Sequence, residues 1–100
     1  MELGKILVSR YGYSVSLVKF YKIVKKTAKS VTLQEMKYKF VSSDGYNQQG
    51  MVVPTNEKED TRIISRRVLD SDSEAPYVKI DNYSRAYVWN NQPVWYDSCD

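Results

Sequence analysis

Apolar and polar residues alternate most clearly between residues 30 and 40, where the period is two. The apolar residues stand first at odd and then at even positions, namely Val31 and Leu33, then Met36, Tyr38 and Phe40. A period of two predicts a β-strand with a buried face. Because a shift of one residue moves the apolar set to the other side, the buried face must change near Gln34-Glu35. We therefore expect either a bulge there or a bend that carries the strand from one sheet face to another, as at the corner of a small closed barrel.

The preceding segment, residues 15–28, fits two patterns. A helical spacing connects its apolar residues Leu17, Phe20, Tyr21, Val24 and Ala28. Periodicity alone would accept an amphipathic helix. The segment is, however, rich in β-branched and aromatic residues, which prefer the pleated surface of a sheet. The strand over residues 30–40 also needs a partner, and the nearest one lies just across residues 26–29. We therefore predict a long β-hairpin over residues 15–40.

The rest of the chain reads as short strands separated by turn-forming residues. Strands are expected at residues 5–10, 51–53, 61–69, 77–81, 85–89 and 94–96. Turns are expected at Gly12, which can adopt a positive φ, and at residues 90–93, where Asn tolerates the left-handed region. Pro54 should end its strand, and residues 56–60 should form an exposed loop. The fold class that follows is all-β, a small antiparallel bent-sheet barrel (SH3-like or OB-like) of about six strands. It would be one domain over residues 1–100, with 1–4 and 97–100 frayed.

The composition limits the kinds of catalytic and metal-binding site that the chain can form. The chain has 100 residues, with 42% hydrophobic and 27% charged residues, which is ordinary for a globular domain. There is no histidine and one cysteine, Cys99. The usual base for Ser or Cys nucleophiles and the commonest zinc ligand are therefore missing, and Cys99 is expected to be an inert thiol. The run Asp70-x-Asp72-x-Glu74 lacks the glycine and the final glutamate of a calcium loop. We expect no catalytic residue, no metal and no cofactor.

Positive charge is concentrated in the first half of the chain. Five lysines fall within eleven residues with no acid among them: Lys19, Lys22, Lys25, Lys26 and Lys29. If they share a face, they form a patch that attracts phosphates. The alternative is a solvated strand pair in which lysine maintains solubility and discourages edge-to-edge pairing.

Two arginines and several tyrosines are further candidates. Arg62 and Arg66 are expected on one strand face, where a guanidinium could hold a phosphate or a carboxylate, or serve in a structural ion pair. Of nine tyrosines, those in predicted turns are the better candidates for exposed, base-stacking or partner-binding positions. They are Tyr11, Tyr13, Tyr46 and Tyr83. Tyr87 and Trp89 share one strand face and are assigned to the core.

Several short motifs together resemble a family of small uncharacterised phage and mobile-element proteins. The motifs span roughly residues 6–96 and lie at 11–13, 18–24, 27–33, 53–54, 66–68, 78–80, 83–89 and Pro93. Family members often have tryptophan where this chain has Tyr11, and glycine where it has Asn91. The resemblance implies a phage or prophage origin and supports the hairpin; it implies no activity.

Two functions remain open at this point. The first is a non-catalytic accessory protein that binds nucleic acid through the lysines, arginines and tyrosines named above. The second is a protein that inhibits a host-defence nuclease, with acidic loops at residues 57–60 and 70–74 occupying a basic channel. No apolar run approaches the ~20 residues needed to cross a bilayer, and no signal peptide is evident at the N-terminus. We therefore expect no membrane partner and a cytoplasmic location in a bacterial host.

Overall fold

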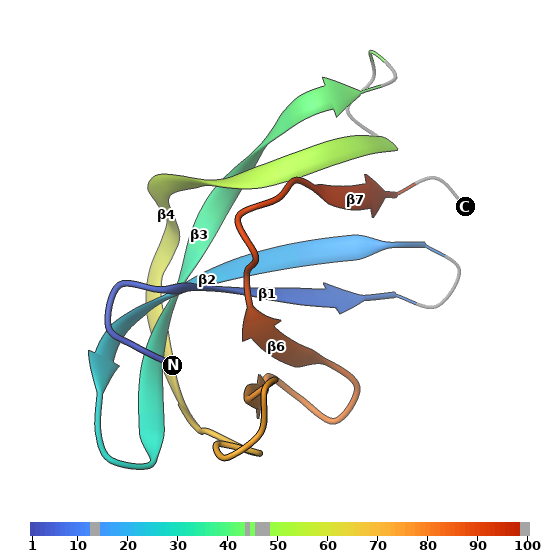
Figure 1. The fold of residues 1–100 in the computed structure, drawn as a ribbon. Helices are drawn as coiled ribbons and strands as arrows, with labels where there is room; N and C mark the ends of the chain where they lie inside the picture. The colour runs from blue at the N-terminus through green and yellow to red at the C-terminus, as the bar shows by residue number, and fades with distance from the viewer. Residues whose placement is uncertain (13–14, 44, 46–48, 99–100) are drawn as a thin grey trace.

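One curled antiparallel sheet forms the molecule in the computed structural model, which describes residues 1–12, 15–43, 45 and 49–98, and the backbone alone at 60–62 (Figure 1). Its seven strands are β1 (Ile6–Tyr11), β2 (Leu17–Lys26), β3 (Ser30–Ser43), β4 (Gln49–Arg67), β5 (Tyr77–Lys79), β6 (Arg85–Val88) and β7 (Val94–Asp97). Their order across the sheet is β5-β6-β1-β2-β3-β4-β7. The predicted all-β, bent-sheet barrel is confirmed, with seven strands rather than about six. No helix long and apolar enough to cross a membrane occurs among these residues.

The predicted hairpin over residues 15–40 is present as β2 and β3. Phe20 pairs with Met36 and Ile23 with Leu33, after which the register shifts by one residue at Val24. Such an extra residue is a β-bulge, and it changes which side the following residues face. The turn between the strands is held by Thr27, whose backbone N–H donates to the Ser30 carbonyl at 2.9 Å.

The change of apolar face along β3 has a structural reason. Its odd residues enter a first core and its even residues a second core, on opposite sides of β1, β2 and β3. The first core consists of Leu7, Tyr21, Ile23, Val31, Leu33, Val78 and Ala86. The second core consists of Val18, Phe20, Met36, Val52 and Val94. β3 pairs regularly with β2 through Gln34 and Glu35, whereas its register with β4 shifts between Gln34 and Met36. The expected bulge is therefore not in β3; the irregularity lies in β4, which has extra residues between Lys58 and Ile63 opposite this point.

Two bridges curl the ends of the sheet around these cores. Leu69 and Tyr77 exchange backbone hydrogen bonds of 2.7 and 3.0 Å, which brings the end of β4 to the edge strand β5. Ser16 and Asp97 exchange two bonds of 2.8 Å, which brings β7 to the start of β2. In Figure 1 the long strands β3 and β4 run along both curled parts. At each end of the sheet, the bridged segment thus folds over one side of β1, β2 and β3.

Two predictions about β4 are wrong. Pro54 does not end a strand, and residues 56–60 are not a separate loop, because β4 continues from Gln49 to Arg67. Pro54 lies opposite Tyr38, beside a register shift, where a missing N–H is tolerated. The next residue, Thr55, replaces the missing contact by donating its hydroxyl to the Lys37 carbonyl at 3.0 Å.

The turns follow the sequence closely. Gly12 has φ 118° and Asn91 has φ 66°, as expected for the two turns. Of the residues that we expected to be frayed, those at the N-terminus make contacts: Met1 packs against the first core, and the Gly4 N–H donates to the Ile23 carbonyl at 2.9 Å.

Candidate functional site

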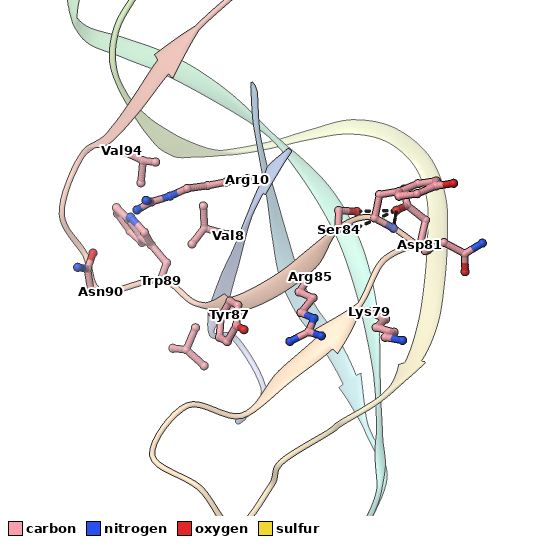
Figure 2. A pocket seen from close by; sticks show the side chains of 13 residues that line it. Val8, Arg10, Lys79, Asp81, Ser84, Arg85, Tyr87, Trp89, Asn90 and Val94 are labelled. Atoms are coloured by element: carbon pink, nitrogen blue, oxygen red, sulfur yellow. Dashed lines mark hydrogen bonds between the residues drawn. The ribbon is translucent and has the colours of Figure 1, made fainter. Parts of the chain in front are cut away.

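An open groove lies on β1, β5, β6 and the segments beside them. Its volume is about 660 Å³. Val8 lies opposite Tyr87 in the pairing of β1 with β6, and Tyr87 lies opposite Tyr77 in the pairing of β6 with β5. Because directly paired residues share a sheet face, these strands present one continuous surface to the groove. Figure 2 shows the lining side chains on this surface. We call it the β6 groove.

A tight turn beside the groove presents Tyr83. The Asp81 Oδ1 atom accepts hydrogen bonds from the Tyr83 N–H at 2.8 Å, the Ser84 N–H at 2.9 Å and the Ser84 hydroxyl at 3.0 Å. An Asp side chain that holds its own following backbone is a local substitute for a backbone turn. The hydrogen bond from Tyr83 and those from Ser84 lower the pKa of the Asp81 carboxyl. The turn leaves Tyr83 95% exposed, which confirms that this tyrosine is an exposed aromatic residue.

Three cations surround the same groove. Lys79 lies directly opposite Arg85 in the β5–β6 pairing, and all three of Arg10, Lys79 and Arg85 are exposed. In Figure 2 the Arg10 side chain extends toward Trp89, while those of Arg85 and Lys79 lie beside one another. Asp81 is the only acidic residue among the described side chains that line the groove. The groove therefore has an excess of positive charge that favours an anionic ligand.

Stacked aromatic rings form part of this surface. The rings of Tyr77 and Tyr87 lie 5.5 Å apart at 36°, and the Arg85 guanidinium lies 4.7 Å from the Tyr77 ring centroid. A hydrogen bond to the Tyr87 side chain raises the pKa of Arg85, so this residue stays charged. Tyr87 is 39% exposed, so the prediction that it belongs to the core is wrong. It lies on β6, next to the edge strand β5.

Trp89 joins the groove to the second core. Its ring meets Phe20 edge-on at 5.9 Å and 78°, and its Nε1–H donates to the Gln92 carbonyl at 2.7 Å. A half-buried tryptophan with its N–H satisfied is a rigid wall for a ligand site.

The structure does not bring the five predicted lysines into one patch. Lys19 lies 5.5 Å from the Tyr11 ring centroid and borders a small pocket with Arg66 and Asp81. Lys22 and Lys25 pair with Gln34 and Thr32 on the side of the second core. Lys26 pairs with Val31 of the first core and therefore faces the other side, and Lys29 is exposed in the turn between β2 and β3. Strand alternation separates Lys19 from Lys22, and the bulge at Val24 determines that Lys25, rather than Lys26, lies on the side of Lys22.

The other predicted residues have varied positions. Arg66 is half-buried and donates to the Ser65 and Ile80 carbonyls at 2.8 and 3.1 Å, whereas Arg67 on the opposite face is exposed. The prediction that Tyr11 lies exposed in a turn is wrong, because Tyr11 ends β1 and is half-buried beside Lys19. Four predicted features lie outside the described residues, namely Tyr13, Tyr46, Cys99 and the side chain of Arg62.

Sequence reasoning missed four residues that line the β6 groove and a fifth that packs against one of them: Arg10, Lys79, Arg85 and Tyr87, with Tyr77 against Tyr87. The segments Tyr77-Val78-Lys79 and Arg85-Ala86-Tyr87 carry an aromatic and a cation two residues apart, in mirrored order around a turn. In an antiparallel hairpin, this order places cation opposite cation and ring opposite ring. That pattern could have identified four of the five; Arg10 depends on the pairing of β1 with β6.

Comparisons with protein-family models, with curated proteins and with solved structures found no match. Among the described residues, no group of three or more His, Cys, Asp or Glu could hold a metal ion.

Proposed function

We propose that this protein is a non-catalytic module that binds single-stranded nucleic acid in the β6 groove. The observation that carries the proposal is the meeting of exposed aromatic rings, Tyr83 and Tyr87, with three cations in one groove. Single strands are bound without sequence preference by this combination, since cations follow the phosphates and rings stack on the bases. A duplex would keep its bases stacked on each other and gain less from the rings.

The geometry supports binding to bases in particular. Tyr83 is held on a hydrogen-bonded turn, so little conformational entropy is lost when a base stacks on it. The Tyr87 ring packs against the neighbouring Tyr77 ring, and the Arg85 guanidinium lies over Tyr77 and is hydrogen-bonded to the Tyr87 side chain. The hydrogen bonds that the Asp81 carboxylate accepts from Tyr83 and Ser84 reduce its repulsion of a phosphate.

The proposal is tested by fluorescence anisotropy with a labelled oligothymidylate of about 12 nucleotides at about 50 mM salt. We expect micromolar binding that weakens steeply with salt. Tyr83→Ala should weaken it by roughly tenfold, because one stacked base contributes about 1–3 kcal/mol. Trp95→Ala is the matched control, since Trp95 is 49% exposed but is not among the residues that line the groove. Absence of a complex at micromolar protein, or equal effects of the two variants, would refute the proposal.

The resemblance to phage and mobile-element proteins supports a role as an accessory factor in the cytoplasm of a bacterial host. The second candidate is an inhibitor that binds a host-defence nuclease. It is favoured by the connection between β4 and β5, where Asp70, Asp72 and Glu74 are all exposed. A stoichiometric host protein that copurifies with the chain, is lost in Asp72→Asn/Glu74→Gln and persists in Tyr83→Ala would favour this candidate over the first.

A further inference from the structure

The surface that carries the β6 groove continues across the sheet toward the β2–β3 hairpin. The Trp89 N–H donates to the Ile6 carbonyl at 2.9 Å, and Ile6 is paired with Lys22. Trp89, which directly follows β6, therefore forms one row with Ile6 of β1 and Lys22 of β2; β6, β1 and β2 lie side by side in Figure 1. Since neighbouring strands are about 4.8 Å apart, Lys22 lies about 10 Å from the groove wall along this row.

The bulge at Val24 places a second lysine on the same surface. Beyond the bulge, Lys25 pairs with Thr32, and Thr32 pairs with Ser65. The hydroxyls of Thr32 and Ser65 lie 3.1 Å apart, which shows that these side chains share a face. Without the bulge, the regular register would place Lys26 there and Lys25 on the other side.

A third cation completes this surface. Arg67 pairs with Ser30, one row further toward the hairpin turn, and it is exposed. The rows beyond Ile6 contain three cations, several hydroxyls and an exposed isoleucine, and none of their members is acidic. The first row consists of Lys22, Gln34 and Ile63, the second of Lys25, Thr32 and Ser65, and the third of Ser30 and Arg67. We call this set the hairpin face.

We propose that the hairpin face is a second phosphate-binding stretch, over which a nucleic-acid strand continues after it leaves the β6 groove past Trp89. This inference rests on the proposed function and extends it by assigning the direction and length of the bound strand. Lysine and arginine side chains neutralise successive phosphates, and the Thr32 and Ser65 hydroxyls are further donors to phosphate oxygens. Ile63, 55% exposed, offers an apolar contact to a sugar or base.

Strand length and two matched double variants test this path. We expect Lys22→Ala/Lys25→Ala to weaken binding of an oligothymidylate of about 12 nucleotides by roughly tenfold, and to leave one of about 4 nucleotides unchanged. The salt dependence for the longer strand should become shallower by about 1.4 in log–log slope, because each phosphate contact on a single strand contributes about 0.7. Lys26→Ala/Lys29→Ala removes the same charge from lysines outside the hairpin face and should change neither slope nor affinity by more than about twofold.

The outcomes separate this inference from the function on which it rests. If neither strand binds the wild-type protein, the proposed function fails and the path fails with it. If both strands bind but the two double variants lose affinity equally, the lysines act only through net charge and the path alone is overturned. Equal affinity of short and long strands for the wild type would also overturn the path alone. Far-UV circular dichroism of each variant confirms that the sheet is intact.

Discussion

A single carboxylate oxygen determines how Tyr83 is presented. Three hydrogen bonds, of 2.8–3.0 Å, converge on the Asp81 Oδ1, one from Tyr83 and two from Ser84. They fix the backbone of residues 81–84 while the tyrosine ring makes no contact that would bury it. The site thus combines an ordered backbone with a freely accessible ring, which is the arrangement that stacking requires.

Asp81 should make stability depend on acid pH. Hydrogen bonds in the folded state lower its pKa below the unfolded value of about 3.9. The resulting stabilisation is fully present above that unfolded pKa and is lost as pH falls through the folded one. We expect the thermal midpoint of the wild type to exceed that of Asp81→Ala at pH 6, and the difference to shrink as pH falls below about 4. Thermal melts followed by circular dichroism across this range check the prediction; a difference independent of pH would contradict it. Ser73→Ala is a useful control because it also removes turn hydrogen bonds but no titrating group.

At the residue scale, sequence reasoning succeeds where the cause is local. The exposure of Tyr83 follows from an Asp-Asn-Tyr-Ser turn whose hydrogen bonds span three residues or fewer. Arg10 joins Arg85 only because β1 pairs with β6, and this long-range pairing has no local signature. The face of Lys25 likewise depends on a bulge whose position the alternation around residues 23–25 does not reveal.

At the element scale, the junction of β3 and β4 depends on Gly50. Gly50 has φ 154°, and a Cβ atom placed there would overlap the Ser42 carbonyl oxygen and crowd the Ser43 Cα at 2.7 Å. Both neighbours are backbone atoms, so neither can move without disturbing the ladder. We expect Gly50→Ala to lower the free energy of unfolding by about 1–3 kcal/mol in urea denaturation. Ser42→Ala, at an exposed neighbouring side chain, should stay within about 0.5 kcal/mol; equal effects would show that the backbone is not close-packed here.

Strand prediction worked for the hairpin of β2 and β3 and failed for the middle of β4. The hairpin of β2 and β3 is adjacent in sequence, so its pattern and turn are both visible in one segment. In β4, Pro54 and the charged run that follows are typical of a loop. These residues of β4 are extended because they run along β3 as its partner strand. Register shifts between the two strands accommodate the extra residues of β4. Tertiary pairing therefore overrides local propensity in this strand.

At the scale of the whole molecule, the two cores share strands and so should not be independent. β1, β2 and β3 each supply residues to both, from alternate positions on their two faces. One curl of the sheet is closed by Leu69 and Tyr77, the other by Ser16 and Asp97. A strand that detaches from one core also exposes the other, and this coupling is the physical basis of all-or-none unfolding in small domains.

Leu33 and Met36 provide a matched test of this coupling, since both are buried on β3 but face different cores. Each substitution by alanine should cost about 2–5 kcal/mol, a large part of the 5–15 kcal/mol typical of a domain. Because the cores share strands, either variant should shift one common urea transition, seen at the same midpoint by far-UV circular dichroism and by tryptophan fluorescence. Trp89 packs against the second core, so its fluorescence reports that core directly. If Met36→Ala shifted the fluorescence transition and left the circular dichroism transition in place, the cores would be separate units, and a strand bound across both could not be held by one rigid surface. A common shift in both variants, with Lys37→Ala unchanged at its exposed position, would instead establish the sheet as a single cooperative support for the groove and the hairpin face.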